Sequence, residues 1–278
     1  MKIETLAFGY SLVEGPRCDS ADNLYFSDVR NGGVYRCAAD GEITTVVPKR
    51  RGVGGIALHA SGGLVISGKN ICHVREGTTR ILFAPPDVPG FNDLFCDASG
   101  RVYTGSMRSD PFSATGPRTP GECYRIDAEG KASLLYGNVS LTNGIGFSPD
   151  GKRLYHVDSV PRQIIVHDVD SADGVSNRRV FAVLASGQTP DGLAVDEEGG
   201  VWVAVFGGGC VQRFTPEGAL DLRVDVPATL VTSLCFGGSD RKDLYIVSAD
   251  NTEDAARHGT IFKTRSPYAG MVVHPARV

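Results

Sequence analysis

Short apolar segments alternate with polar turns along the whole chain, and one kind of apolar segment recurs six times. The copies begin at Leu24, Leu64, Val102, Leu154, Val201 and Leu244, at intervals of 40, 38, 52, 47 and 43 residues. They read LYFSD, LVISG, VYTGS, LYHVD, VWVAV and LYIVS and are rich in the β-branched and aromatic residues that favour strands. Each follows a turn rich in Asp, Ser and Gly, such as DSADN or DEEGG, which suits a tight hairpin. Because helical periodicity is almost absent, the pattern predicts an all-β chain.

The spacing of the copies predicts how the strands are arranged. A period of about 44 residues with several strands in each repeat is typical of β-propeller blades. Six copies therefore predict a six-bladed β-propeller, with residues 1–278 as one domain. The N-terminal IETLAF reads as a strand that completes the last blade beside GTIFKTRS, which would remove an open sheet edge. A sandwich of eight or more strands is the alternative, but it does not predict six repeats in phase.

Polar residues recur at one position of the repeat, 10 to 12 residues before each apolar copy. The six residues at this position are Glu14, Gly54, Asn92, Asn143, Asp191 and Thr232. Equivalent positions of propeller blades lie on one ring around the central axis. We therefore expect two carboxylates and two carboxamides to converge at the mouth of the central tunnel.

Such a ring suggests a metal ion. Two buried carboxylates repel each other, and a divalent cation removes that repulsion. Oxygen ligands suit a hard cation such as Ca²⁺, Mg²⁺ or Mn²⁺, and Zn²⁺ or Fe²⁺ stays open. The alternative is that these residues only cap turns at the ends of the inner strands.

Composition and charge narrow the class of protein. The net charge is −4 with acidic and basic residues interspersed, so we expect no nucleic-acid partner. The N-terminus holds no signal-peptide core and no stretch approaches a membrane span, so we expect no membrane association. Seven cysteines without a CxxC pair read as reduced, buried thiols, which favours a cytoplasmic protein. A monomer and a homodimer both stay open.

Longer motifs extend over nearly the whole chain. They are VEGP at 13–16, LYFSDV at 24–29, GGIALHASGGLVIS at 54–67, FNDLFCDASGRVYTGSM at 91–107, LTNGIGFSPDGKRLYHVDS at 141–159 and TPDGLAVDEEGGVWVA at 189–204. In these motifs the chain resembles the senescence-marker-protein/gluconolactonase (regucalcin-like) family of six-bladed β-propeller lactonases. The resemblance implies a hydrolase that opens lactone rings, with one divalent metal ion, calcium first among the candidates.

The resemblance also implies roles for the ring. Glu14, Asn143 and Asp191 match the family's three protein ligands to the metal, and Asn92 matches a residue that reaches the metal or the substrate. On this basis Asp191 is the expected general base that deprotonates the attacking water, while the metal polarises the carbonyl. Asn92 is expected to orient the substrate or donate a hydrogen bond to it. A serine nucleophile is not supported, because no GxSxG motif is present.

One position departs from the family's pattern. Sugar-lactonase members carry an arginine two residues before the asparagine of FND, where this chain has Gly90. We expect Arg108, Arg118 or Arg17 to take its place from the loops, with the first two as substrate-binding candidates. The long interval holds an extra Pro- and Gly-containing loop, 106–122, which we interpret as a lid over the site.

Other functions and other roles stay open at this point. A metal-dependent phosphotriesterase on the same fold and a non-catalytic calcium-binding propeller are the alternatives to a lactonase. Asp28 and Asp158 read as hydrogen-bonded inner-blade residues rather than ligands. His156 reads as a core histidine and Phe206 as a wall of the pocket.

Overall fold

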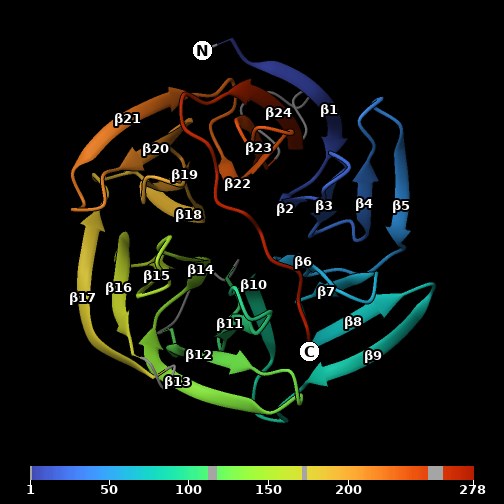
Figure 1. Cartoon of the computed structure of the whole chain (residues 1–278), viewed down its shortest axis with the longest axis vertical. Coiled ribbons are helices and arrows are strands. Elements are labelled where there is room, and N and C mark those ends of the chain that lie inside the picture. The colour runs from blue at the N-terminus through green and yellow to red at the C-terminus, as the bar shows by residue number, and fades with distance from the viewer. Residues whose placement is uncertain (1, 112–117, 171–173, 250–258) are drawn as a thin grey trace.

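Six four-stranded antiparallel sheets are arranged around a central axis in the computed structural model, which describes residues 2–111, 118–170, 174–249 and 259–278 (Figure 1). The predicted all-β six-bladed propeller is therefore confirmed. None of the described residues forms a helix long and apolar enough to cross a membrane.

Four strands in chain order form each of the first three blades. Blade 1 consists of β2 (Val13–Cys18), β3 (Leu24–Asp28), β4 (Val34–Cys37) and β5 (Ile43–Val47). Blade 2 consists of β6 (Ile56–Leu58), β7 (Leu64–Ile66), β8 (Ile71–Arg75) and β9 (Thr78–Phe83). Blade 3 consists of β10 (Gly90–Cys96), β11 (Val102–Met107), β12 (Gly121–Ile126) and β13 (Ala132–Val139).

Two further blades repeat this order, and the sixth closes the ring. Blade 4 consists of β14 (Thr142–Phe147), β15 (Arg153–Asp158), β16 (Gln163–Val169) and β17 (Val175–Val183). Blade 5 consists of β18 (Thr189–Val195), β19 (Val201–Phe206), β20 (Cys210–Phe214) and β21 (Leu220–Asp225). Blade 6 consists of β22 (Val231–Gly237), β23 (Asp243–Ser248), β24 (Gly259–Arg265) and the N-terminal β1 (Glu4–Tyr10).

The first and last strands of the chain pair in blade 6, as the sequence predicts. β1 pairs antiparallel with β24, with Glu4 opposite Lys263 and Phe8 opposite Thr260. The last sheet is thus completed by the first strand, and the ring closes through backbone hydrogen bonds.

The hydrophobic core lies between neighbouring blades. The recurring apolar segments form the second strand of each blade, and their side chains pack against the adjacent sheet. Val157 of blade 4 and Val203 of blade 5 share one buried cluster. Trp202 is fully buried and meets Phe236 of blade 6 edge-on, with ring centroids 5.5 Å apart, so it packs between blades 5 and 6. Six of the seven free cysteines are buried as well.

An aspartate fixes the hairpin turn that precedes the second strand in alternate blades. Asp19, Asp97 and Asp196 each accept backbone N–H groups from the residues two and four positions further on. Their other oxygen accepts from the aromatic residue six positions on, which is Tyr25, Tyr103 or Trp202. These turns are the Asp-rich segments of the sequence repeat.

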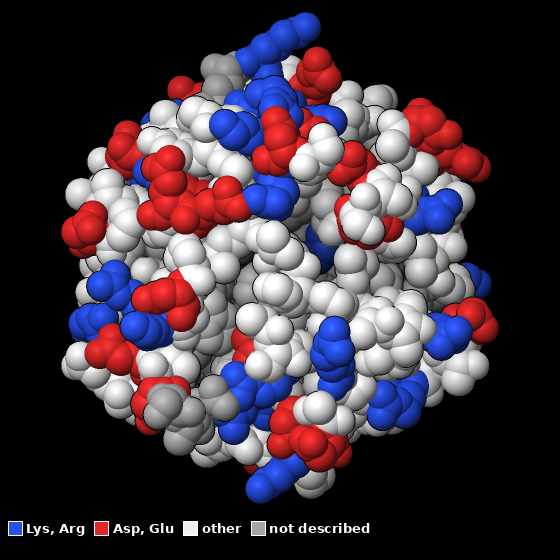
Figure 2. Space-filling model, in the orientation of Figure 1, with Lys and Arg blue, Asp and Glu red and all other residues white. Residues whose placement is uncertain are grey.

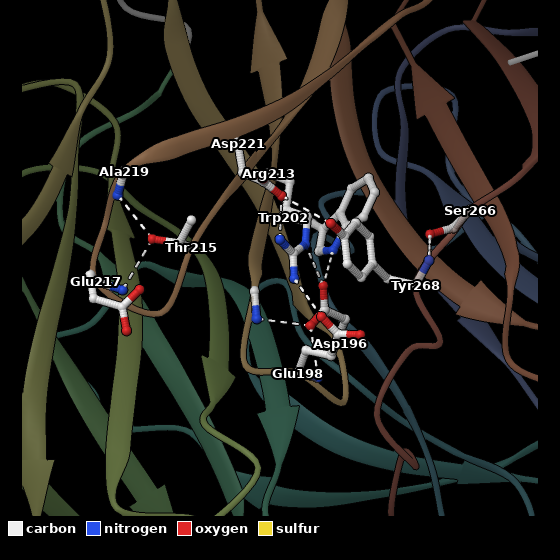
Figure 3. A network of polar contacts seen from close by, with 11 residues as sticks. Asp196, Glu198, Trp202, Arg213, Thr215, Glu217, Ala219, Asp221, Ser266 and Tyr268 are labelled. Carbon is white, nitrogen blue, oxygen red and sulfur yellow. Dashed lines mark hydrogen bonds and ion pairs between the residues drawn. The ribbon is translucent and has the colours of Figure 1, made fainter.

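The C-terminal segment crosses one face of the propeller (Figure 1). It bridges the first turn of blade 5 through Gly270 and that of blade 2 through Ala276. Figure 3 shows how it is held, with Tyr268 beside Arg213, whose guanidinium lies 3.6 Å from the ring centroid. On this face, acidic and basic side chains are interspersed and no large area carries one sign (Figure 2).

Candidate active site

Irregularities in the inner strands place five of the six ring residues. The pairing of the first strand with the second shifts register between Glu14 and Arg17, Phe91 and Leu94, Thr142 and Ile145, Pro190 and Leu193, and Val231 and Ser233. A bulge of this kind bends the strand and re-aims a side chain. Here it aims the side chain at the ring position toward the central axis in five of the six blades.

Small residues let the inner strands approach one another closely. A Cβ at Gly144 would lie 2.2 Å from the backbone nitrogen of Leu193, and one at Gly192 would lie 2.1 Å from Ser233 Oγ. A Cβ at Gly54 would lie 2.0 Å from Asn92 Oδ1, so the glycine at this ring position makes room for the Asn92 side chain. The glycines of NGIG and DGLA are therefore required by packing around the axis.

A cavity of about 410 Å³ opens at the end of the axis where the inner strands begin. The C-terminal segment contacts the opposite ends of the same strands, so the cavity lies on the other face. The described residues that line the cavity include Glu14, Asn92, Asn143, Asp191 and Thr232 from the ring. The structure therefore brings together the ring residues that the phase of the repeats selects, although it does not test their roles.

The two carboxamides form a hydrogen-bonded pair. Asn92 Nδ2 donates to Asn143 Oδ1 at 2.6 Å and to the Thr142 carbonyl at 2.9 Å. Asn143 Nδ2 donates to Ser159 Oγ at 2.8 Å, and Ser159 in turn donates to the Pro190 carbonyl at 2.7 Å. Since the Ser159 hydroxyl donates its proton to a carbonyl, Ser159 Oγ can only accept a hydrogen bond from Asn143. The Asn143 amide is therefore held with its nitrogen toward Ser159 and its oxygen away from it.

The two carboxylates are buried and not fully paired. Glu14 is 9% exposed and Asp191 8% exposed. Burial, together with the charges of Asp191 and Asp93, raises the pKa of Glu14 well above its usual range. Burial and the Asp93 charge do the same to the pKa of Asp191. Asp191 Oδ1 is buried and meets no hydrogen-bond partner among the described residues, which is costly unless a cation or a proton compensates it.

A third carboxylate lies next to the ring and has a cationic partner. Asp93 Oδ1 is 3.7 Å from the guanidinium of Arg17, which also donates to the Leu94 carbonyl at 3.0 Å. Burial outweighs this partner and raises the pKa of Asp93 to about 6. Arg17 is 4% exposed and belongs to β2. The expectation that it acts on substrate from a loop is therefore wrong, because its charge serves Asp93 within the inner strands.

The donor set fits a hard divalent cation. Among the residues that the structure describes, no three His, Cys, Asp or Glu side chains form a metal-binding group. Glu14 and Asp191 supply two carboxylates, and further oxygens come from a carboxamide, here Asn143. An all-oxygen set with an unpartnered buried carboxylate oxygen matches the preference of Ca²⁺, Mg²⁺ or Mn²⁺ better than that of a thiophilic metal.

The two arginines expected to bind substrate lie outside the cavity lining. Arg108 Nε donates to Glu122 at 2.7 Å, and its terminal nitrogens reach the carbonyl and carboxylate of Asp87. Arg118 donates to the carbonyl of Pro111 at 3.2 Å. Both therefore hold the loop between β11 and β12, and their role in substrate binding stays a prediction. Residues 112–117 of the proposed lid lie outside the described residues, although Met107 and Pro111 at its start line the cavity.

The smaller predictions about neighbouring residues are confirmed. Asp28 accepts from the backbone of Ser11 at 3.0 Å, and Asp158 accepts from the backbone of Leu141 at 3.0 Å. His156 is buried with both ring nitrogens bonded, to Tyr136 and Thr142. Phe206 lines the cavity.

Sequence reasoning missed most of the cavity walls. They come from the residues that follow the second strands, such as Val29 and Arg30, Ser159 and Ala249, and from those just before the inner strands, such as Leu12, Leu141 and Leu230. Both groups lie in phase with the same repeat. Aligning the ends of the apolar copies, and not only the positions ahead of them, would have found them.

Comparison with known proteins decides the family. Residues 12–250 match the family model described as the SMP-30/Gluconolactonase/LRE-like region. The chain belongs to this family. It is 34% identical over 268 residues to L-arabinolactonase of Azospirillum brasilense, covering 91% of this chain and 88% of that protein. It is 32% identical over 252 residues to regucalcin of Bos taurus, covering 87% and 84% of the two chains.

A solved structure extends the likeness to the whole fold. The structure of a luciferin-regenerating enzyme superposes with a TM-score of 0.90 at 26% identity and covers 100% of this chain and 99% of that one. This SMP-30/gluconolactonase-like chain thus shares its six-bladed architecture with family members along its full length.

Proposed function

We propose that the protein is a divalent-metal-dependent lactonase, which hydrolyses a small-molecule cyclic ester to the open hydroxy acid. The observation that carries the proposal is the pair of buried carboxylates, Glu14 and Asp191, on a cavity of about 410 Å³, with one carboxylate oxygen unpartnered among the described residues. The lactonase named among its relatives supports the same reaction class.

Glu14, Asn143 and Asp191 would hold the metal ion. Calcium is the first candidate, and Mg²⁺, Mn²⁺, Zn²⁺ and Fe²⁺ are alternatives. When bound, the ion would neutralise the carboxylates and act as a Lewis acid toward a carbonyl oxygen. Ser159 orients Asn143 for this role, since it fixes the amide nitrogen and leaves the oxygen for the cavity.

Asp191 would act as the general base, with Asn92 as the residue that orients the substrate. Asp191 accepts a proton from a water whose oxygen adds to the lactone carbonyl carbon. The ring C–O bond then breaks, and the proton passes to the departing ring oxygen to give a hydroxyl group and a carboxylic acid. With Oδ1 on the metal ion, the second carboxylate oxygen of Asp191, which lines the cavity, would be the acceptor that this transfer needs.

The proposal is tested by removing the metal with a chelator and restoring single divalent cations. Proton release is followed for an aldonolactone, simple γ- and δ-lactones, an aromatic lactone and a phosphotriester. We expect metal-restored lactone hydrolysis that Asp191→Asn abolishes, because this substitution removes both a metal ligand and the general base. The control is Asp168→Asn, which changes a partly exposed aspartate of β16 outside the cavity. Turnover confined to the phosphotriester, or full lactone turnover by Asp191→Asn, would contradict the proposal.

A further inference from the structure

The cavity walls above the ring are largely apolar. Leu12 and Ala249 are joined by a β-bridge, as are Phe206 and Leu230, and all four line the cavity. These bridges make a continuous apolar surface across blades 5, 6 and 1. Met107 and Leu141 line the cavity from blades 3 and 4.

Several polar side chains that line the cavity donate their hydrogen bonds to other groups of the protein. Both described hydrogen bonds of Asn92 Nδ2 go to Thr142 and Asn143. The Ser159 hydroxyl donates to the Pro190 carbonyl. The Thr232 hydroxyl donates to the Val13 carbonyl at 2.5 Å and lies 3.2 Å from the Val247 carbonyl. Apart from the two carboxylates, the described part of this lining therefore offers few groups to bond a ligand that carries several hydroxyl groups.

Glu14 and Asp191 are the proposed metal ligands, and the other described polar residues of the lining add little. Thr189 contributes one hydroxyl, and the exposed Arg30 contributes a cation that takes part in an interaction with the rest of the protein. A polyhydroxylated ring placed against these walls would lose hydrogen bonds to water without replacement, and each hydroxyl left unpaired there weakens binding.

From these two observations we infer that the site selects a lactone with an apolar alkyl or aryl substituent, rather than a polyhydroxylated sugar lactone. The inference narrows the substrate of the proposed function, and it rests on that function for the assumption that the substrate is a lactone. The ester would lie over Asp191 and Asn92, and the apolar substituent would lie against Phe206, Leu230 and Leu12.

The inference is tested with a homologous series from γ-butyrolactone to γ-nonalactone, with L-arabinono-γ-lactone as the hydroxylated comparison. Each buried methylene should raise kcat/KM of the metal-loaded protein by about fourfold until the cavity is filled. Phe206→Ser and Leu230→Ser should reduce this increment to about twofold or less, because part of the wall becomes polar. Leu134→Ser, which changes an exposed leucine of β13, is the matched control and should keep the full increment.

Binding of 2-alkylcyclopentanones, which cannot be hydrolysed, is measured in parallel by calorimetry and separates this inference from the proposed function. Affinity that rises with chain length supports the apolar site even if no lactone is turned over. The absence of turnover would then contradict only the proposed reaction. Lactone turnover that is flat along the series, or that prefers the sugar lactone, would overturn the inference and leave the lactonase standing. If no lactone is turned over and binding shows no trend with chain length, both the inference and the proposed function are overturned.

Discussion

At the residue scale, Ser159 sets the orientation of Asn143, which is a proposed metal ligand. Ser159→Ala removes one of the two hydrogen bonds that hold the Asn143 amide and leaves only the bond from Asn92 to its oxygen, so the amide is less firmly oriented. We expect metal affinity to fall by about 10–100-fold, as for other residues that orient a ligand. Calorimetric titration of the metal-free protein measures the change.

The control for this prediction is another buried serine. Ser148 donates to Asp150 at 2.6 Å and accepts from the Arg153 backbone, and it does not line the active-site cavity. Ser148→Ala should cost stability without changing metal affinity. Equal affinities in the two variants would show that Ser159 does not position the ligand.

The burial of His167 destabilises the folded protein. It is 2% exposed, stacks on Tyr136 at 3.9 Å, and neither ring nitrogen has a hydrogen-bond partner within the described part of the chain. Burial and the charge of Arg178 lower its pKa to about 4. His167→Phe keeps the stacking and removes the unpaired N–H, so we expect it to stabilise the protein by about 1–2 kcal/mol at pH 7.5.

The same substitution makes a prediction about pH. Because the folded-state pKa is below the unfolded value of about 6.5, the unfolded chain binds a proton first as pH falls. The stability present above about pH 6.5 is lost toward pH 4, at about 1.4 kcal/mol per pH unit. Urea unfolding should therefore show a smaller loss between pH 7.5 and pH 5 in His167→Phe than in the wild type. His73→Phe is the control and should destabilise the folded protein, since His73 bonds the Gly62 carbonyl at 2.8 Å. A His167→Phe variant that is less stable than the wild type at pH 5 would refute the prediction.

At the element scale, Asp turns fix the first hairpin of blades 1, 3 and 5, and blade 5 adds a buried ion pair. Asp196 is fully buried and accepts from Arg213 Nε at 2.7 Å, besides its turn bonds and Trp202 (Figure 3). Asp196→Ala leaves the Arg213 charge buried without this partner, which should cost about 3–5 kcal/mol of unfolding free energy.

The equivalent turn of blade 1 provides the comparison. Asp19 accepts only from neutral groups in its described hydrogen bonds and is partly exposed. Asp19→Ala should therefore cost about 1–2 kcal/mol. Urea denaturation of the two variants measures the difference, and equal losses would mean that the Arg213 pair adds nothing to the turn.

The strands and the irregularities within them differ in how far the sequence predicts them. The apolar copies predict the second strand of each blade, because the alternation of apolar and polar residues and the turn residues are local signals. The inner-strand bulges at Asn92, Asn143 and Asp191 depend on cross-strand register, which no local pattern encodes. Arg17 was expected in a loop, but Asp93 from another blade and the carbonyls of Pro16 and Leu94 make its burial tolerable.

At the scale of the whole molecule, ring closure by β1 is the feature that the repeat predicts and the structure confirms. Deleting residues 1–10 would leave β24 as an exposed edge and blade 6 with three strands. We expect a lower thermal midpoint and association beyond that of the full chain, because an open edge pairs with other chains. Light scattering with thermal unfolding checks this, and an unchanged midpoint and mass would contradict it.

The ring could be selected from the sequence because blade geometry repeats around one axis, so phase along the chain becomes position in space. The cavity walls and the loop arginines could not be placed in the same way. Arg108 and Arg118 sit in the longest insertion, where the repeat gives no register, and their partners Asp87, Glu122 and Pro111 decide where they point.

The central claim is that Glu14, Asn143 and Asp191 hold one divalent cation, and calorimetric titration of the metal-free protein with Ca²⁺ tests it most directly. The account predicts one ion bound per chain in the wild type, with binding lost in both Glu14→Gln and Asp191→Asn, which keep the side-chain shape but remove a charge. Binding retained in both variants, or no binding of Ca²⁺, Mg²⁺, Mn²⁺, Zn²⁺ or Fe²⁺ by the wild type, would contradict it.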